Sequence, residues 1–508
     1  MTTVRLAGTL ALCVAAALVP GPARAQAQAP QAAEDVARRQ LESGRAFARQ
    51  GNYEEAVRDF RAVAETHATT SVADDAWLEL ARYYVDVARD LAEAQAAVDT
   101  ILTGYATSDS APDAYVLAGR LAMERSHRAE DLDTALANFD RVSRLFPESP
   151  AVPRALQMAG LAQFYAGDLD AALATLSRVT AEFPSDPAAA LAGVAAARVL
   201  VARGEPVPAM EELQQVRNRF PASDTARIAL DRLTLLYRLY LRAPHGPAWT
   251  AGDETAGPAR LENVTGMATT GDGRVIWASE AGLGLAAPDG ARPPAYVGRA
   301  RGLALDRLGQ PAVLEGTVLR PSSGDALIFA APQGGGLDAL DRLVAAGQLS
   351  TGEWVVMDDD ERSLHRFTGA AEYVAPFQSA RVTRLAVSDL DRVAGIDRDG
   401  RDVFIFDAGG MLISQIQLRA DAYDLRDAED VKFDAFGHLY VLDRDALAVF
   451  TPFGEAGADG GVTYRPLTVF SVPEGQAGRF DRATALAVDG AGALFLYDDR
   501  NRRIQVYR

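Results

Sequence analysis

Two acidic segments of this chain carry the residue types that bind calcium. One is the run 358–361 (DDDE), and the other is the turn 397–402, in which Asp397, Asp399 and Asp402 alternate with other residues. Calcium takes about six to eight oxygen ligands, usually including a bidentate carboxylate. Neither segment places a distal acid for that role, and an Asp at the start of a turn also accepts backbone N–H groups. We therefore expect Asp358 and Asp397 to cap turns.

Other motifs for catalysis are absent from the sequence. It contains no Gly-x-Ser-x-Gly elbow, no His-Glu-x-x-His pair and no phosphate-binding glycine loop followed by lysine. The histidines are scattered, without the short spacing of a metal site: His67, His127, His245, His365 and His438. We expect a protein with no catalytic residues, no metal and no cofactor. For His365 and His438 we expect hydrogen-bonded structural roles.

The N-terminus has the pattern of a secretory signal peptide over residues 1–25. Arg5 is followed by an apolar stretch that is short for a membrane span, and Ala23-Arg24-Ala25 has the small-x-small order of a cleavage site. We expect cleavage after Ala25, a flexible stretch over 26–33, and a periplasmic or secreted protein. An uncleaved anchor is the alternative. The only cysteine, Cys13, lies in this segment, so the mature chain has no disulfide.

Charge bears on the class of partner. The net charge is −18, and cleavage after Ala25 removes two arginines and no acid. A chain this acidic repels phosphate backbones, which argues against nucleic acid as the main partner.

The elements that position these residues form two repeat arrays. Residues 34–243 contain an alanine followed four residues later by a large apolar residue, at intervals of 37 to 41 residues. Such a pair lies on one face of a helix. The five pairs are Ala56/Phe60, Ala94/Val98, Ala135/Phe139, Ala172/Leu176 and Ala209/Leu213. This pattern predicts about eleven helices, packed in pairs.

Small residues and breakers recur in phase with these pairs. A small residue stands where the first helix of each pair should cross its partner: Gly44, Ala81, Gly119, Gly160 and Ala197. Gly51, Gly167 and Gly204 are placed to end first helices in the left-handed conformation. The third repeat departs from the pattern through an insertion of about four residues near 126–130.

These features resemble the tetratricopeptide repeat, most clearly in Gly44–Phe60 and Gly160–Pro184. The endings LFPESP, EFPSDP and RFPASD are similar to the envelope branch of that family, which includes the cell-division coordinator of the Tol-Pal system. The resemblance implies an α-solenoid. It also implies that the residue after each small residue faces the concave groove. That residue is arginine in four repeats: Arg45, Arg82, Arg120 and Arg198. The row could bind an acidic or C-terminal segment, or each arginine could pair with an acid of an adjoining helix.

A linker is expected at 244–259, where Pro, Gly and Ala replace the helical period, and a β-propeller over 260–508. Six units follow, each with a turn residue and a polar or acidic residue six positions later: Gly273/Ser279, Gly309/Glu315, Gly352/Asp358, Asp391/Asp397, Gly437/Asp443 and Gly492/Asp498. In the fourth unit an acid, Asp391, replaces the glycine. The spacings predict six blades, with the count uncertain by one.

The segments 434–450 and 489–507 resemble the NHL repeat. Because the chain stops after a third strand, we expect the segment 259–263 to supply the missing strand and close the ring. Some six-bladed relatives are lactonases or lyases that hold a metal in the central channel. The resemblance puts the following residues at the channel mouth: Asn263, Arg301, Arg384, Glu429, Asp430 and Thr484. Their mixed charges do not form an evident metal cage.

The sequence therefore favours a non-catalytic scaffold of the bacterial cell envelope that binds other envelope proteins through the solenoid groove and the propeller face. A propeller enzyme with a metal in its channel, and a periplasmic sensor of small ligands or carbohydrates, are the alternatives. Because solenoid repeats couple mainly to their neighbours, we expect the propeller to unfold independently of the helices.

Overall fold

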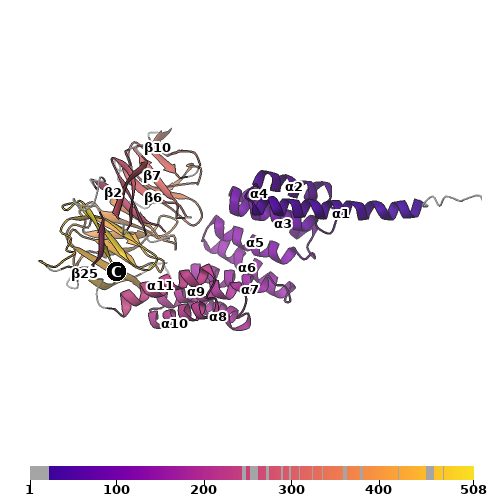
Figure 1. Cartoon of the computed structure of the whole chain (residues 1–508), viewed down its shortest axis with the longest axis horizontal. Coiled ribbons are helices and arrows are strands. Elements are labelled where there is room, and N and C mark those ends of the chain that lie inside the picture. Colours follow the sequence, from indigo (N-terminus) through magenta and orange to yellow (C-terminus); the bar gives the residue numbers. More distant parts are fainter. Residues whose placement is uncertain are drawn as a thin grey trace, which may run out of the picture. The chain divides into compact units, whose positions relative to one another are not determined.

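The computed structural model describes residues 22–242, 247–251, 261, 263–270, 274–287, 290–296, 299–307, 309–322, 324–333, 336–358, 363–377, 381–420, 423–453, 463–472 and 474–508. Most of the expected signal peptide and linker thus lies outside the described residues. The chain divides into two compact units, residues 1–117 and 118–508, with the boundary inside one helix. Figure 1 shows the helices and the propeller, coloured along the sequence.

The first unit consists of helices. They are α1 (Pro22–Arg49), α2 (Tyr53–Arg61), α3 (Ala73–Tyr83), α4 (Leu91–Gly104) and the start of α5 (Ala111–Arg125), with π-helical turns η1 (Ala62–Thr66) and η2 (Tyr84–Ala88). α1 begins at Pro22, so the residues 26–33, for which a flexible stretch was expected, lie within this helix. Proline is compatible with the first turn of a helix, where its missing N–H would have no partner.

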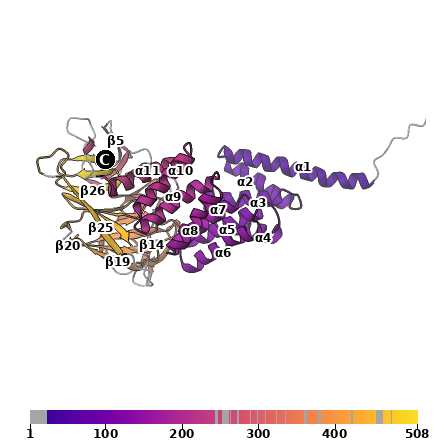
Figure 2. The same ribbon diagram turned by 90° about the horizontal axis from the view of Figure 1, so that it is seen from below.

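The second unit begins with the remaining helices. After the end of α5 come α6 (Ala129–Leu145), α7 (Val152–Tyr165), α8 (Leu169–Glu182), α9 (Pro187–Ala202), α10 (Pro206–Arg219) and α11 (Asp224–Tyr240). Figure 2 shows these helices from below. The described residues thus contain eleven α-helices, as predicted. None of them is both long and apolar enough to cross a membrane.

The repeat residues pack as the sequence predicts. All five alanines and their large partners are at most 2% exposed. A Cβ atom on Gly44 would come within 2.6 Å of the Phe60 ring, and one on Gly160 within 2.6 Å of the Leu176 side chain. Glycine is therefore required at these crossings because any side chain would collide with the partner helix. Gly51, Gly167 and Gly204 have φ values of 80°, 83° and 79°, which confirms the left-handed caps.

Six four-stranded antiparallel sheets form the propeller in the second unit. In chain order the first three are β2 (Val264–Thr269), β3 (Val275–Ser279), β4 (Gly282–Ala287) and β5 (Gly290–Tyr296); β6 (Gly302–Leu305), β7 (Pro311–Glu315), β8 (Val318–Pro321) and β9 (Leu327–Ile328); and β12 (Leu343–Gln348), β13 (Trp354–Asp358), β14 (Ser363–Phe367) and β15 (Tyr373–Pro376).

The other three blades complete the ring. They are β16 (Val382–Val387), β17 (Val393–Asp397), β18 (Asp402–Phe406) and β19 (Leu412–Gln417); β22 (Asp430–Phe433), β23 (Leu439–Leu442), β24 (Ala446–Phe453) and β25 (Thr463–Ser471); and β26 (Ala483–Val488), β27 (Leu494–Asp498) and β28 (Arg503–Tyr507) with β1 (Pro247–Ala251). Two small hairpins join blades, β10 (Ala330–Gln333) with β11 (Gly336–Ala339), and β20 (Arg419–Ala420) with β21 (Tyr423–Asp424). The six innermost strands contact one another in sequence, and β26 contacts β2.

The strand that closes the ring differs from the prediction. β1, inside the expected linker, pairs with β28 through Ala251 opposite Ile504 and Thr250 opposite Gln505. β1 thus takes the place beside β28 that was predicted for the segment 259–263, of which only Leu261 and Asn263 are described. Residues 252–260 and 262 lie outside the described part. Closure itself, which leaves no open sheet edge between the first and last blades, is as predicted.

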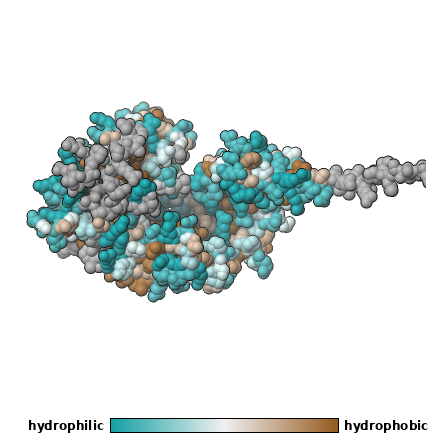
Figure 3. Space-filling view, in the orientation of Figure 1, coloured by the Kyte–Doolittle hydropathy of each residue, from teal (hydrophilic) through white to brown (hydrophobic). Residues whose placement is uncertain are grey.

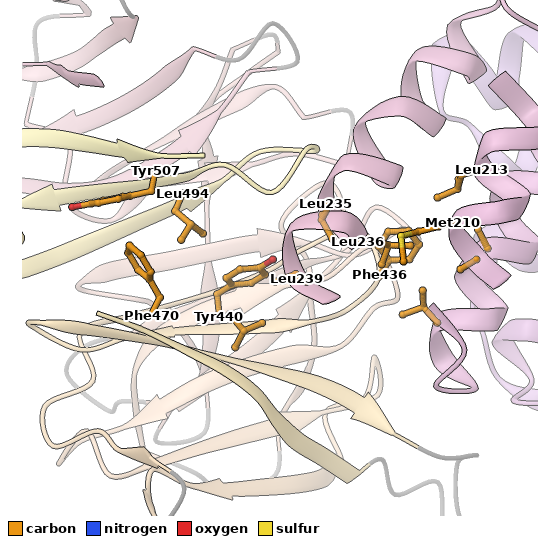
Figure 4. Packing of buried hydrophobic residues seen from close by; sticks show 14 of the residues in the cluster. Met210, Leu213, Leu235, Leu236, Leu239, Phe436, Tyr440, Phe470, Leu494 and Tyr507 are labelled. Carbon is orange, nitrogen blue, oxygen red and sulfur yellow. The ribbon is translucent and has the colours of Figure 1, made fainter. Parts of the chain in front are cut away.

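One hydrophobic core runs from the helices into the propeller. It contains Leu213 of α10, Leu235 and Leu239 of α11, and Tyr440 and Leu494 of the last two blades. Figure 4 labels these side chains, from Leu213 on α10 through Leu235 and Leu239 on α11 to Tyr440 and Leu494 of the strands. The expectation of independent unfolding assumed that solenoid repeats couple mainly to their neighbours, whereas this core also couples the helices α9 to α11 to the propeller. The helices α9 to α11 and the last two blades should lose their structure together.

Candidate functional site

The helices of the second unit lie against one face of the propeller. In blades two, four, five and six, the turn from the innermost strand to the second strand contacts these helices. Arg238 of α11 donates to the carbonyl oxygen of Ala491 (2.7 Å), and Arg307 in the β6–β7 turn forms an ion pair with Glu124 of α5 (3.0 Å). The described surface seen in Figure 3 is mostly hydrophilic.

A buried hydrogen-bond network fixes α11 to the fifth blade. The His438 side chain is fully buried; its Nδ1 lies 2.8 Å from Asp434 Oδ2, and its Nε2 lies 2.9 Å from the Tyr240 hydroxyl of α11. The same carboxylate accepts a hydrogen bond from the Tyr440 hydroxyl at 3.1 Å. This Asp-His-Tyr order resembles a proton relay, but with His438 fully buried no substrate could reach it. The structural role expected for His438 is confirmed, and His365 is likewise hydrogen-bonded, to Ser363 at 2.7 Å.

Two departures from the repeat patterns meet at the same face. His127 lies in the insertion of the third helical repeat, and its Nδ1 is 2.9 Å from the Asp391 carboxylate. Asp391 is the acid that replaces the turn glycine of the fourth blade, and it has a left-handed φ of 56°. The corresponding glycines, Gly352 and Gly437, have φ values of 88° and 82°. An Asp in this conformation is strained relative to glycine, so its side-chain contacts must stabilise it.

Asp391 holds three groups together. Its carboxylate accepts hydrogen bonds from the backbone N–H of Ser350 (2.7 Å) and from the Ser350 hydroxyl (2.6 Å), in addition to its contact with His127. The His127 ring stacks on the Tyr165 ring of α7, with centroids 3.9 Å apart. Burial raises the pKa of the Tyr165 hydroxyl, which keeps that ring neutral. The contact thus joins the third and fourth blades to α7.

A cavity of about 900 Å³ surrounds this contact, and we call it the joint cavity. Its helical wall consists of the ends of α5, α7 and α9 and the starts of α6 and α8. Its propeller wall comes from blades three, four and five. Charged groups line it in both signs: Arg125, Arg128, Arg366, Arg392, Asp131, Glu353, Asp391 and Asp407. Its volume is in the range of sites that enclose drug-sized ligands.

Burial perturbs one carboxyl group of the cavity wall. It raises the pKa of Glu353, and the nearby guanidinium of Arg366 opposes that shift. The two side chains form an ion pair with Arg366 Nε 3.5 Å from Glu353 Oε2. Arg366 also donates from Nη1 to the carbonyl oxygen of Ala408 at 2.6 Å.

The arginine row predicted for the groove is paired with acids. Arg45 contacts Glu79 at 2.8 Å and Asp75 at 3.6 Å, and Arg82 contacts Asp113 at 3.4 Å. Arg120 lies 3.4 Å from Glu124 of its own helix. Arg198 lies 3.7 Å from Asp389 of the propeller. The structure thus shows the ion-paired arrangement that the sequence left open beside the binding hypothesis, although Arg198 pairs outside the helices.

The candidate channel-mouth residues lie at the other ends of the innermost strands. Asn263, Arg301 and Glu429 directly precede β2, β6 and β22, and Asp430 begins β22. Arg384 and Thr484 lie inside β16 and β26, because irregular pairing near the starts of these strands adds a residue that the alignment missed. The residues that precede β12, β16 and β26 are Arg342, Arg381 and Arg482.

Part of this set is brought together by hydrogen bonds. Arg384 Nε donates to the carbonyl oxygen of Glu429 at 2.6 Å, and the Glu429 side chain accepts from Arg444 at 3.2 Å. Asp430 accepts from the backbone N–H of Leu486 at 2.9 Å. Among the described residues no group of three His, Cys, Asp or Glu side chains could hold a metal ion.

The acidic turns act largely as expected. Asp397 accepts from the backbone N–H groups of Arg401 (2.6 Å) and Asp402 (3.0 Å), which confirms its role as a turn cap. Asp358 accepts from the N–H of Arg342 before the innermost strand of its blade, at 3.2 Å. Residues 359–361 of that acidic run lie outside the described part of the chain.

The joint cavity was not predicted from the sequence. Two features of the sequence mark it: the insertion near 126–130 and the acid Asp391 in place of a turn glycine. Each was interpreted only as a departure from its own repeat pattern, one in the helices and one in the blades. Neither array alone indicates that the two positions meet.

Comparison with known proteins agrees with this architecture. A family model described as tetratricopeptide repeat matches residues 163–233. No curated protein sequence matches the chain. A gluconolactonase from Xanthomonas campestris has a TM-score of 0.35 and 15% identity, covering 52% of this chain and 98% of its own. Virginiamycin B lyase from Staphylococcus aureus has a TM-score of 0.33 and 9% identity, covering 49% of this chain and 80% of its own.

On the helical side, PilW, a widely conserved type IV pilus biogenesis factor, has a TM-score of 0.33 and 18% identity, covering 40% of this chain and 86% of its own. These likenesses are too distant to carry an argument about substrate or partner. The tetratricopeptide-repeat match thus covers residues 163–233 of a region of eleven helices, and a six-bladed β-propeller follows these helices.

Proposed function

We propose that this protein is a non-catalytic protein–protein interaction scaffold of the bacterial cell envelope. The observation that carries the proposal is the joint cavity, because helix ends and propeller turns line it together. A shared core and the His127–Asp391 contact hold these walls in place. A site built from both arrays suits a partner that is recognised by both, and helical repeats offer extended concave surfaces besides.

Export to the envelope is part of the proposal. It is supported by the charged start, apolar stretch and small-x-small ending of residues 1–25. Mass spectrometry of the protein from its native host should find an N-terminus at Gln26. A chain that keeps residues 1–25 and stays in the cytoplasm would contradict this part.

Scaffolding is favoured over catalysis by the way the candidate channel-mouth residues are used. Arg384, Glu429 and Asp430 are held by hydrogen bonds to the protein itself, and Glu429 is bonded to Arg444. Groups bound in this way stabilise the ring more readily than they bind a reacting molecule.

Affinity capture tests the proposal when it is followed by direct binding. The mature full-length chain is used to capture proteins from native envelope extract, and each captured protein is purified and titrated against it. We expect a stoichiometric complex. If no purified envelope protein binds the chain, or if the chain instead hydrolyses lactones with a stoichiometric metal, the proposal is wrong.

The arginine row provides a variant for this test. Arg82→Glu should weaken the complex if the groove contributes, because it places a like charge beside Glu79 and Asp113. Arg58→Glu, at an exposed position of α2, makes the same change of charge and serves as the control. Equal effects of the two variants would show that the row binds no partner.

A further inference from the structure

We infer that the joint cavity binds a carboxylate group of an acidic peptide segment, through Arg366, Arg128 and Thr351. This inference rests on the proposed scaffold function and names the chemistry of its partner. The sequence suggested that arginines of the solenoid groove bind acidic segments. The inference places this binding in the joint cavity instead.

The carboxylates of the cavity are already occupied by donors of the protein. Asp131 accepts from the Ser126 hydroxyl, and Asp391 accepts from Ser350 and contacts His127. Asp407 accepts from the backbone N–H of Met411 at 2.8 Å. Glu353, the other carboxylate of the lining, forms an ion pair with Arg366. Because each carboxylate has a partner within the protein, the cavity offers little to a cationic ligand.

The donors of the cavity are less fully engaged. The Arg366 side chain is only 10% exposed, yet its Nε has no hydrogen-bond partner, since its contact with Glu353 is 3.5 Å long. The Thr351 hydroxyl is also buried without a partner. Arginine can only donate, so a buried Nε is satisfied by an acceptor and by nothing else. A ligand carboxylate would supply that acceptor.

Arg128 adds an exposed positive charge at the same site. It lies in the insertion of the third helical repeat, beside His127, and close enough to lower the pKa of Glu353. Within the described parts of the chain, its side chain forms no hydrogen bond and no ion pair. Arg128 belongs to the helical wall and Arg366 to the propeller wall, and both act on the Glu353 carboxyl. Guanidinium groups are suited to bind a further carboxylate at the same site.

The C-terminus of α7 at this cavity does not change the preference for a carboxylate over a cation. The carboxyl end of α7 would favour a cation if its carbonyl groups were free. They are not, because Gln163 accepts from the N–H of Asp168 and Phe164 accepts from the N–H of Gly167, both at 3.0 Å.

The remaining wall fits a peptide better than a small acid. Apolar side chains surround the charged groups: Phe164, Leu169, Val374, Leu390, Ile413 and Phe436. A volume of about 900 Å³ leaves most of the cavity empty around a single carboxylate. A segment with acidic and apolar residues would fill both parts.

Fluorescence anisotropy with the full-length mature chain tests the inference. The probe is a labelled peptide of alternating Glu and Leu residues with a free C-terminus, and the comparison is the same peptide with Gln for Glu and an amidated end. We expect the Glu peptide to bind at least about tenfold more tightly, the size expected for a hydrogen bond to a charged group. Equal affinities would overturn the inference.

Variants locate the site. Arg128→Gln should weaken binding of the Glu peptide about tenfold, and Thr351→Val should weaken it several-fold while keeping the side-chain shape. Arg144→Gln, at an exposed position of α6 outside the cavity, removes the same charge and should change nothing. A loss in Arg144→Gln equal to that in Arg128→Gln would show unspecific attraction and overturn the site.

Two further experiments are needed. The first distinguishes a peptide carboxylate from a free small acid, and the second distinguishes failure of the peptide site from failure of the scaffold function. Free glutarate should compete only at concentrations far above the peptide's; competition at equal concentration would show a small-acid site and overturn the peptide assignment. If envelope partners bind the Arg128→Gln variant as tightly as the parent chain, the inference fails and the scaffold function stands. If no envelope protein binds, the scaffold function fails whatever the peptide does.

Discussion

Arg82 and Arg198 occupy the same position of their repeats but pair with different parts of the molecule. Arg82, in the N-terminal unit, contacts acids of its own helical array, Glu79 and Asp113. Arg198, in the C-terminal unit, reaches Asp389 of the propeller. The repeat motif therefore determines how helices cross, while the neighbouring elements determine what the outer positions do.

The two units differ in the same way in their cores. In the N-terminal unit, Leu80 and its neighbours are buried among helices, so each helix depends on the next one in the array. In the C-terminal unit, Leu235 of α11 is fully buried in a core that continues into the propeller. The core of the N-terminal unit is thus formed between neighbouring helices, whereas the core around α11 is shared between helices and propeller.

Substitutions in the two cores test this comparison and should have the largest effect on stability. Leu235→Ala should reduce the free energy of unfolding by about 2–5 kcal/mol, as for other buried leucines. Because its core is shared, hydrogen exchange should speed up in α9–α11 and also in blades five and six. Leu80→Ala is the matched substitution, and it should speed exchange in the N-terminal helices alone. Faster hydrogen exchange of the propeller in Leu80→Ala would contradict the division into units. Unchanged exchange of the propeller in Leu235→Ala would contradict the shared core.

Tyr240→Phe tests the connection between α11 and the fifth blade by removing the hydrogen bond between Tyr240 and His438. The change leaves His438 Nε2 buried without its partner, so unfolding should become easier by about 1–3 kcal/mol. Urea denaturation followed by circular dichroism measures this. Tyr237→Phe, on the same helix but 49% exposed, is the control and should be neutral. Equal midpoints for the two variants would show that the network does not hold α11 to the blade.

Asp391→Gly returns the fourth blade to the glycine of its repeat. Glycine relieves the left-handed strain, a gain of about 1 kcal/mol, but the contacts with Ser350 and His127 are lost. These effects nearly cancel in global stability. The joint should nevertheless loosen, so hydrogen exchange around 126–131 should speed up while the fourth blade keeps its protection. Unchanged exchange at 126–131 would show that Asp391 serves the blade alone.

Sequence reasoning succeeded where a residue's role is set within one repeat. Gly44 and Gly160 were assigned to helix crossings because every repeat has a small residue there, and the structure shows why. The closing strand was misplaced because residues 247–251, which include a proline, show no clear alternation, and pairing with β28 is a long-range choice. The joint cavity could not be derived, since His127 and Asp391 belong to different arrays and only their three-dimensional arrangement brings them together.

The smallest expected effect concerns acid stability in the N-terminal unit. Glu34 of α1 accepts hydrogen bonds from the Ser71 hydroxyl, the Ser71 backbone N–H and Arg38, and these lower the pKa of its carboxyl from 4.5 to about 2. The folded state therefore binds this proton more weakly than the unfolded state does. The stabilisation is complete above pH 4.5 and is lost as the pH falls towards 2.

Glu34→Gln should remove that pH dependence and leave the stability at neutral pH slightly reduced. Hydrogen exchange of α1 and the residues around Ser71, measured between pH 5 and 2.5, checks this after correction for intrinsic exchange. Glu42→Gln, at an exposed position of the same helix, controls for the loss of one charge. Because the contact lies within the N-terminal unit, the propeller should show the same acid response in all three chains. A propeller response that follows the Glu34 substitution would mean that the first unit is coupled to the second, as the shared core couples α11 to the blades.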